Sequence, residues 1–281
     1  MELQTFLSCW ANELDLATAV SCAREWGYDG VEGPAPSDPG ERREVAAEIS
    51  ARGMPYIAEI ATGGNYVPAA GLSVAQHLDD LEWHLTQRVA EFDPVIVNVL
   101  GGSDRWSFAE SVEFHTRANQ LAAQSGYGIC WEIHRSRPTF NPWATRDLLL
   151  EIPEMRLNCD FSHWCAVCER LVLDEEPGIL ELCAERCRHI HARVGYEQGP
   201  QVPDPRDLLY QSQLDAHMRW WRKLVAAAEG RGSKLVTATP EFGPDGYLQL
   251  RPHSHERAAD LPEVNAWMAR ELASITNANI E

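Results

Sequence analysis

Four acidic or imidazole side chains stand at or near the ends of apolar segments in the second half of the chain. A buried carboxylate without a partner costs several kcal/mol, so such groups gathered at one place must share a positive charge. Two or three carboxylates with one imidazole suit Mn, Mg, Co or Zn and leave positions open for substrate oxygens. The sequence therefore predicts one divalent metal ion, with the ligands Glu132, Asp160, His191 and Glu241.

An ion-pair network is the alternative for these carboxylates, because arginines lie close to them in the sequence. Arg135, Arg137 and Arg193 could each bind a carboxylate through paired hydrogen bonds. Arg193 lies two residues after His191, so both side chains face the same way on an extended strand. We expect Arg193 at the rim of the site, where it binds a substrate carboxylate, phosphate or hydroxyl. By the same period His189 faces this side, one layer deeper.

The predicted site requires elements that bring these side chains together. Short apolar runs alternate with longer amphipathic stretches, which is typical of βα units around a parallel sheet. Several amphipathic stretches end in glycine before an apolar run, as in EWGYDG and EISARGMPY. The predicted strands are 3–10, 30–34, 55–62, 95–102, 128–135, 156–164, 188–195 and 234–243. The predicted helices are 12–26, 74–91, 107–125, 142–151, 177–186, 208–229 and 262–276.

These segments predict an α/β fold, a single (β/α)8 TIM barrel that spans residues 1–281 as one domain. No G-x-G-x-x-G follows a predicted strand, which argues against a dinucleotide-binding fold. Active sites of such barrels form at the C-terminal ends of the strands. His134 shares a face with Glu132 and is expected to bind substrate there. Five other residues are expected near the same rim: Glu59, Asn98, Trp106, Trp10 and Trp164. Of these, Trp10 and Trp164 either stack on a sugar face or fill the core.

Composition narrows the partners and the compartment. The formal net charge of −18 argues against nucleic acid as a partner, because phosphate contacts need Lys and Arg. No apolar run is long enough to span a membrane and no signal-peptide pattern is present. The eight Cys are then expected to stay reduced in the cytoplasm. A zinc site is the alternative for two spaced pairs, Cys165 with Cys168 and Cys183 with Cys187.

The order of the four predicted ligands resembles the xylose isomerase-like barrel superfamily, which includes tagatose 3-epimerases, hydroxypyruvate isomerase, inosose dehydratase and endonuclease IV. That group has Glu at the fifth strand, Asp-x-x-His at the sixth, His at the seventh and Glu at the eighth. This chain has Glu132, Asp160-x-x-His163, His191 and Glu241. The resemblance implies that Glu132 and Glu241 exchange a substrate proton through a metal-stabilised enediolate. It also implies that His163 contacts a substrate oxygen, unless His163 is a capping or core residue.

Two departures limit how far the resemblance extends. Tagatose-type epimerases carry an Arg six residues after the seventh-strand His, where this chain has Glu197. Endonuclease IV uses further His ligands, but the predicted strand 55–62 has none, and Arg206 stands where its Asp-x-His motif places a His. A nuclease is therefore not expected. The Pro-rich loop 196–207 is expected to fold over the site, where Gln198 and Gln201 either bind substrate hydroxyls or lie in solvent.

We therefore expect a metal-dependent isomerase or epimerase that acts on a small carbohydrate-like substrate. A lyase or dehydratase of the inosose dehydratase type is the alternative, since loss of a β-hydroxyl after proton removal uses the same residues. A non-catalytic metal- or sugar-binding barrel is a third possibility, which the complete ligand set disfavours. A homo-oligomer stays open, because many proteins with this resemblance are dimers or tetramers.

Overall fold

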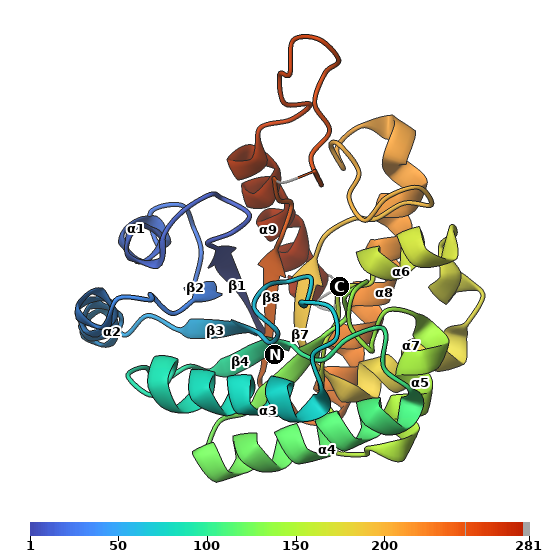
Figure 1. The fold of residues 1–281 in the computed structure, drawn as a ribbon. Coiled ribbons are helices and arrows are strands. Elements are labelled where there is room, and N and C mark those ends of the chain that lie inside the picture. The colour runs from blue at the N-terminus through green and yellow to red at the C-terminus, as the bar shows by residue number, and fades with distance from the viewer. Residues whose placement is uncertain (245, 278–281) are drawn as a thin grey trace.

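The computed structural model of the protein describes residues 1–244 and 246–277. Within them, parallel strands close into a barrel in chain order, with β1 pairing to β8 from Glu2↔Leu235 to Thr5↔Ala238. Figure 1 shows the barrel strands at the centre and the helices around them. The predicted TIM barrel is confirmed. The strands are β1 Glu2–Ser8, β2 Gly30–Pro34, β3 Tyr56–Ala61, β4 Ile96–Leu100, β5 Ile129–Glu132, β6 Leu157–Asn158, β7 Cys187–Ala192 and β8 Leu235–Pro240.

The helices follow the strands along the chain. They are α1 Leu16–Cys22, α2 Pro39–Arg52, α3 Val74–Trp83, α4 Phe108–Ser125, α5 Pro142–Glu151, α6 Ser162–Cys168, α7 Pro177–Arg186, α8 Gln211–Gly230 and α9 Leu261–Asn277. A π-helical turn, His84–Arg88, extends α3, and short 3-10 turns occupy Val172–Asp174 and Leu208–Tyr210. No helix in the described part of the chain combines the length and the apolar character needed to cross a membrane.

Helix α4 illustrates how the sequence sets these elements. The Ser107 hydroxyl accepts a hydrogen bond from the backbone N–H of Glu110, and the Glu110 carboxylate accepts one from the backbone N–H of Ser107. Together the two bonds form a capping box. Gly126 ends the helix with a φ of 78°, a left-handed conformation that favours glycine. Between the caps Phe114, Ala118 and Ala122 recur every four residues and are buried against the barrel.

Helix α2 was absent from the predicted helices. Its sequence, PGERREVAAEISAR, is mostly polar, so the apolar period that marks the other helices is weak. The end signals were nevertheless present. Asp38 caps the N-terminus through the backbone N–H groups of Gly40 and Glu41, Pro39 is the first helical residue, and Gly53 ends the helix with a φ of 53°.

The predicted strand 156–164 is wrong in its second half. Strand β6 ends at Asn158, and helix α6 begins at Ser162. The Asp160 carboxylate accepts hydrogen bonds from the backbone N–H of Ser162 at 3.1 Å and from the Ser162 hydroxyl. Such local side-chain bonds compete with a strand ladder and favour a turn. Asp160 therefore stands in the turn just beyond β6, at the C-terminal end of the barrel.

The interior of the barrel changes character along its axis. Phe6, Ile57, Ile96 and Cys130 form a buried apolar cluster separate from the main core, which lies between strands and helices. Residues two positions later on these and neighbouring strands face the same interior, because side chains alternate along a strand. Those later positions are polar and lie towards the C-terminal ends: Glu32, Glu59, Asn98, Glu132 and His191.

Candidate active site

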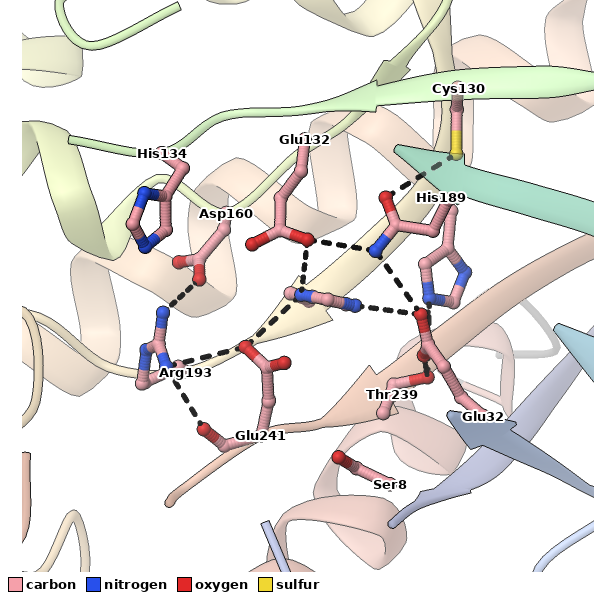
Figure 2. A network of polar contacts seen from close by, with 12 residues as sticks. Ser8, Glu32, Cys130, Glu132, His134, Asp160, His189, Arg193, Thr239 and Glu241 are labelled. Atoms are coloured by element: carbon pink, nitrogen blue, oxygen red, sulfur yellow. Dashed lines mark hydrogen bonds and ion pairs between the residues drawn. The ribbon is translucent and has the colours of Figure 1, made fainter. Parts of the chain in front are cut away.

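The C-terminal ends of four neighbouring strands deliver the four predicted ligands. Glu132 is the last residue of β5, Asp160 lies two residues beyond β6, His191 is on β7, and Glu241 directly follows β8. All four side chains are buried, and one ligand atom from each lies within 4.8 Å of the others. Figure 2 shows the carboxylates of Glu132, Asp160 and Glu241 turned towards a common centre. The structure thus brings together side chains that are far apart in the sequence.

His191 lies at the centre of this group. Its Nδ1 atom is 3.1 Å from Oε2 of Glu241 and 3.8 Å from Oε2 of Glu132, yet it is buried and makes no hydrogen bond. Its Nε2 atom lies 3.0 Å from Oε1 of Glu32, which accepts the ring N–H. A second carboxylate on the far nitrogen is the arrangement that fixes the tautomer of metal-ligating histidines. The Nδ1 atom then faces two carboxylates.

The four side chains fit a divalent cation. Around an octahedral ion with donors at about 2.1 Å, neighbouring donor atoms are about 3 Å apart and opposite ones about 4.2 Å. The separations of 3.1 and 3.8 Å, with all four atoms inside 4.8 Å, match that scale. Donors this close repel one another unless a positive charge lies between them. The unsatisfied Nδ1 of His191 is the atom that such an ion would satisfy.

The pKa values reflect the crowded negative charge. Burial, together with the charges of Glu241 and Asp160, raises the pKa of Glu132 to about 8 against the opposing charge of His191. Burial likewise raises the pKa of Asp160, against the opposing charge of Arg193. Burial lowers the pKa of His191, but Glu241, Glu32 and Glu132 outweigh it, so this pKa lies well above its usual value. The raised pKa values of Glu132, Asp160 and His191 all indicate that the site favours added positive charge.

Arg193 supplies part of that charge. Its guanidinium donates to the Asp160 carboxylate, and its Nη1 atom lies 3.3 Å from Oε2 of Glu241 (Figure 2). It also donates to the Ser162 hydroxyl at 3.1 Å. The ion-pair alternative is therefore present for two of the four predicted ligands. It does not extend to Glu132, which forms no ion pair with an arginine in the described part of the chain. Arg193 is also buried, where the sequence suggested an accessible rim.

The other two arginines of that alternative bind elsewhere. Arg137 is buried and donates to the backbone carbonyls of Thr62, Gly102 and Asn65, so it fixes the loops after β3 and β4. Arg135 lies over the ring of Tyr247, 5.3 Å from its centroid. Neither bridges the carboxylates of the site.

A second polar layer, built around Glu32, lies beneath these ligands. The Glu32 carboxylate accepts from the Thr239 hydroxyl and lies 3.1 Å from Nε2 of His189. Asn98 donates to Oε2 of Glu132 at 2.8 Å and to Oε1 of Glu32 at 3.4 Å, so it connects the two layers. Glu32 was absent from the predicted site residues, although it is a lone carboxylate in the apolar strand GVEGP, the same kind of signal that identified Glu132. His189 takes the deeper position expected for it.

A cavity of about 250 Å³ opens above the ligands. Trp10, His134 and Arg193, for which substrate binding was predicted, line it, and so does Glu59. Tyr66 and Tyr247 were not anticipated, because they lie in loops without a motif. The lining residues are Trp10, Pro34, Glu59, Ile60, Ala61, Asn65, Tyr66, Leu100, Glu132, His134, Arg193, Glu241 and Tyr247.

His163 and Trp164 do not line this cavity, and both take the core positions that the sequence left open as the alternative. The Nε2 atom of His163 accepts a hydrogen bond from Nη2 of Arg193 at 2.9 Å, and the ring is fully buried. Trp164 is also fully buried, packs on Phe161 and donates to the carbonyl of Thr139 at 2.9 Å. The reason is that α6 begins at Ser162, so both side chains lie on a helix inside the core.

Two further sequence predictions concerned the loops. Gln201 is buried and exchanges two hydrogen bonds with the backbone of Gly243, while Gln198 is exposed, so neither lines the cavity. Trp106 also lies outside it and donates to the carbonyl of Leu72.

The cysteines do not gather into a metal site. All eight are unpaired. Cys165 and Cys168 are on α6, Cys183 is on α7, and Cys187 begins β7. The two groups of potential metal ligands within residues 1–244 and 246–277 contain no cysteine. They are the four residues above and a lower group of Glu32, His189 and His191.

Comparison with known proteins extends these findings. No protein-family model and no curated protein sequence matches the chain. Solved structures of xylose isomerase-like TIM barrel proteins do match its fold. The probable 3-DHS dehydratase of petrobactin synthesis from Bacillus anthracis is 12% identical, with a TM-score of 0.60 over 96% of this chain and 98% of that one. D-allulose 3-epimerase from Methylomonas sp., in complex with D-allulose, is 15% identical, with a TM-score of 0.59 over 97% and 96%.

A xylose isomerase-like barrel protein from Mycobacterium smegmatis, in complex with magnesium, is 13% identical, with a TM-score of 0.59 over 97% of each chain. Each likeness covers almost the whole of both chains. At these identities the likeness shows the fold alone, a closed (β/α)8 barrel.

Proposed function

We propose that this protein is a divalent-metal-dependent isomerase or epimerase of a small carbohydrate-like molecule that carries a carbonyl group. The observation that carries the proposal is the unsatisfied Nδ1 of His191, which faces Glu132 and Glu241 at the floor of a cavity. Glu132, Asp160, His191 and Glu241 would hold the metal. When bound, the ion supplies the positive charge that polarises a substrate carbonyl and makes the adjacent C–H bond acidic.

Glu132 and Glu241 are the groups proposed to move the proton. Both carboxylates line the cavity, and they approach it from β5 and from the end of β8. One carboxylate takes the proton from the substrate carbon, and the other returns a proton to the opposite face or to the neighbouring carbon. Asn98 holds Oε2 of Glu132 at 2.8 Å, which orients that carboxylate and leaves its other oxygen for substrate.

The cavity supports a small polyhydroxy substrate. Its volume of about 250 Å³ suits a molecule the size of a monosaccharide. Trp10 and Tyr247, which pack edge to face with ring centroids 5.2 Å apart, offer apolar faces for the C–H groups of such a molecule. Glu59, His134 and Arg193 offer polar groups for its hydroxyls. The fold shared with an epimerase that carries D-allulose supports the same substrate class.

Dehydration is the second candidate, and a specific contact favours it. The hydroxyl of Tyr247 lies 3.5 Å from Nε2 of His134, and both side chains line the cavity. Such a pair is positioned to protonate a leaving hydroxyl, the additional step that separates a lyase from an isomerase. The fold is also shared with a probable dehydratase.

Incubation in D2O distinguishes these reactions. The Mn-loaded protein would be mixed with a panel of ketoses and inososes, and products would be followed by NMR and mass spectrometry. Deuterium uptake without loss of water supports isomerisation, and loss of water supports the lyase. Glu132→Gln should abolish exchange, whereas the control Glu197→Gln, outside the cavity, should not. Absence of exchange with every substrate, or wild-type behaviour of Glu132→Gln with an active substrate, would contradict the proposal.

A further inference from the structure

A second cavity lies at the opposite end of the barrel from the candidate active site. Its volume is about 440 Å³, and it is lined by the residues that begin β4, β7 and β8 together with the inner face of α8. The walls contributed by Ile96, Leu224, Leu235 and Val236 are apolar. This is the N-terminal face of the barrel, where residues ordinarily serve stability instead of catalysis.

Four cationic side chains line this cavity. Arg156 precedes β6, Arg188 is on β7, Arg231 follows α8, and Lys234 precedes β8. The chain as a whole has 24 Lys and Arg against 42 Asp and Glu, so a local surplus of positive charge runs against its composition. Glu185 is the acidic residue of the lining.

These cations do not pair with carboxylates. None of the four forms an ion pair with any carboxylate of residues 1–244 and 246–277, whereas exposed arginines elsewhere, such as Arg117 and Arg219, do. Backbone carbonyls anchor two of them instead.

Arg156 donates to Pro153 and Met155 at 2.9 and 3.0 Å, and Arg231 donates to Ala184 at 2.7 Å. Such bonds fix a guanidinium in place without neutralising it, and they leave its other N–H groups available.

The guanidinium groups are close enough to repel one another. Burial lowers the pKa of Arg156, and the charges of Arg186, Arg231 and Arg188 lower it further. Arg186 lies at the edge of the same group and donates to the carbonyl of Pro153. Like charges held together in this way destabilise the free protein, and a bound anion would relieve the repulsion.

We propose that this cavity binds the phosphate group of a small molecule. Guanidinium forks match phosphate oxygens in pairs, and several convergent cations favour a multiply charged anion over a single carboxylate. The apolar walls beside the cations give the rest of such a molecule a surface to pack on. Because the cavity is at the N-terminal end of the barrel, the ligand would stabilise or regulate the protein and would not be its substrate. The proposal is independent of the proposed function.

Calorimetry on the metal-free protein tests this directly, with inorganic phosphate, adenosine monophosphate and adenosine as probes. Removing metal with EDTA prevents phosphate from binding at the active site through an ion. We expect saturable binding of phosphate or of the monophosphate, which weakens as NaCl rises, and no binding of adenosine. Tighter binding of the monophosphate would identify an ester as the ligand, and equal binding would identify free phosphate.

A pair of double variants supplies the control. Arg188→Gln with Arg231→Gln should weaken phosphate binding by at least about tenfold, because charge-assisted bonds of roughly 1.5–3 kcal/mol are lost. Arg43→Gln with Arg222→Gln makes the same change in net charge at exposed positions on α2 and α8 and should leave binding unchanged. Absence of saturable binding at millimolar concentrations, or an equal loss in both double variants, would overturn the proposal. The proposal would also be overturned if the protein forms a dimer that Arg188→Gln with Arg231→Gln dissociates while phosphate has no effect. A second copy of the chain would then occupy this face.

Discussion

The ring N–H of His191 on β7 points to the carboxylate of Glu32 on β2, with Nε2 and Oε1 3.0 Å apart. This contact crosses the interior of the barrel and joins residues that are far apart in the sequence. It orients the ring so that Nδ1 faces Glu241 and Glu132, 3.1 and 3.8 Å from their Oε2 atoms. Glu32 thereby acts on the proposed metal through His191, and its role is to position a ligand.

Replacing Glu32 should weaken metal binding without removing a ligand. For Glu32→Gln we expect an affinity for Mn2+ about 10–100-fold lower than in the wild type, as for other partners of metal-ligating histidines. Titration calorimetry measures this, with circular dichroism as the check on folding. Metal affinity that stays at the wild-type value in a folded Glu32→Gln protein would show that the contact with His191 has no positioning role.

Arg193 and the metal should compensate the same carboxylates. In EDTA, Arg193→Gln removes the guanidinium that pairs with Asp160 and Glu241, and the free energy of unfolding should fall by about 3–5 kcal/mol. Adding Mn2+ should stabilise this variant more than the wild type, because the ion replaces the missing charge. Urea unfolding with and without Mn2+ provides both numbers.

The matched control for this experiment is the exposed pair of Arg146 with Asp147. Arg146→Gln should cost less than about 1 kcal/mol in either condition. A loss in Arg193→Gln that is the same with and without Mn2+ would separate Arg193 from the metal site.

Glu59 is expected to bind a substrate hydroxyl. Its carboxyl group lines the cavity, receives no hydrogen bond from the described residues, and has a pKa raised well above the usual value by burial and by the charges of Glu32 and Glu241. Glu59→Leu should raise KM about tenfold, the value of a single hydrogen bond to a bound substrate, with the affinity for Mn2+ unchanged. Steady-state kinetics and metal titration check the two halves of this prediction, and an unchanged KM would place Glu59 outside the substrate contacts.

Two buried histidines should make the metal-free protein sensitive to acid. Burial lowers the pKa of His115 and of His217 to about 4. An unfolded His has a pKa of about 6.5, so between about pH 6.5 and about pH 4 the unfolded state binds protons that the native state does not bind. Stability is therefore lost as pH falls through this range. Each residue contributes a slope of about 1.4 kcal/mol per pH unit in this range.

Urea unfolding in EDTA at a series of pH values measures that slope. His217→Gln should reduce it by about 1.4 kcal/mol per pH unit, whereas the exposed His255→Gln should not change it. An unchanged slope in a folded His217→Gln protein would show that His217 is already protonated in the native state, or that it titrates normally.

The barrel and the grouping of the four acidic and imidazole residues were accessible from the sequence because their signals are local. A carboxylate at the end of an apolar run marks the C-terminal end of a strand, and the barrel closes those ends together. Contacts across the barrel left no such signal. Nothing near Glu32 in the sequence indicates that it meets His191.

The errors have equally local causes. The strand predicted over 156–164 ends early because the Asp160 carboxylate accepts a hydrogen bond from Ser162 and starts a turn. The helix that follows the turn places His163 and Trp164 in the core. Tyr247 reached the cavity from the loop after β8, where no periodic pattern fixes side-chain direction.

Crystals grown with Mn2+ and measured for anomalous scattering test the central claim most directly. We expect one strong peak at about 2.0–2.3 Å from the carboxylate oxygens of Glu132, Asp160 and Glu241 and from Nδ1 of His191. A peak at the lower group of Glu32, His189 and His191, or no peak with Arg193 still bound to Asp160 and Glu241, would contradict it.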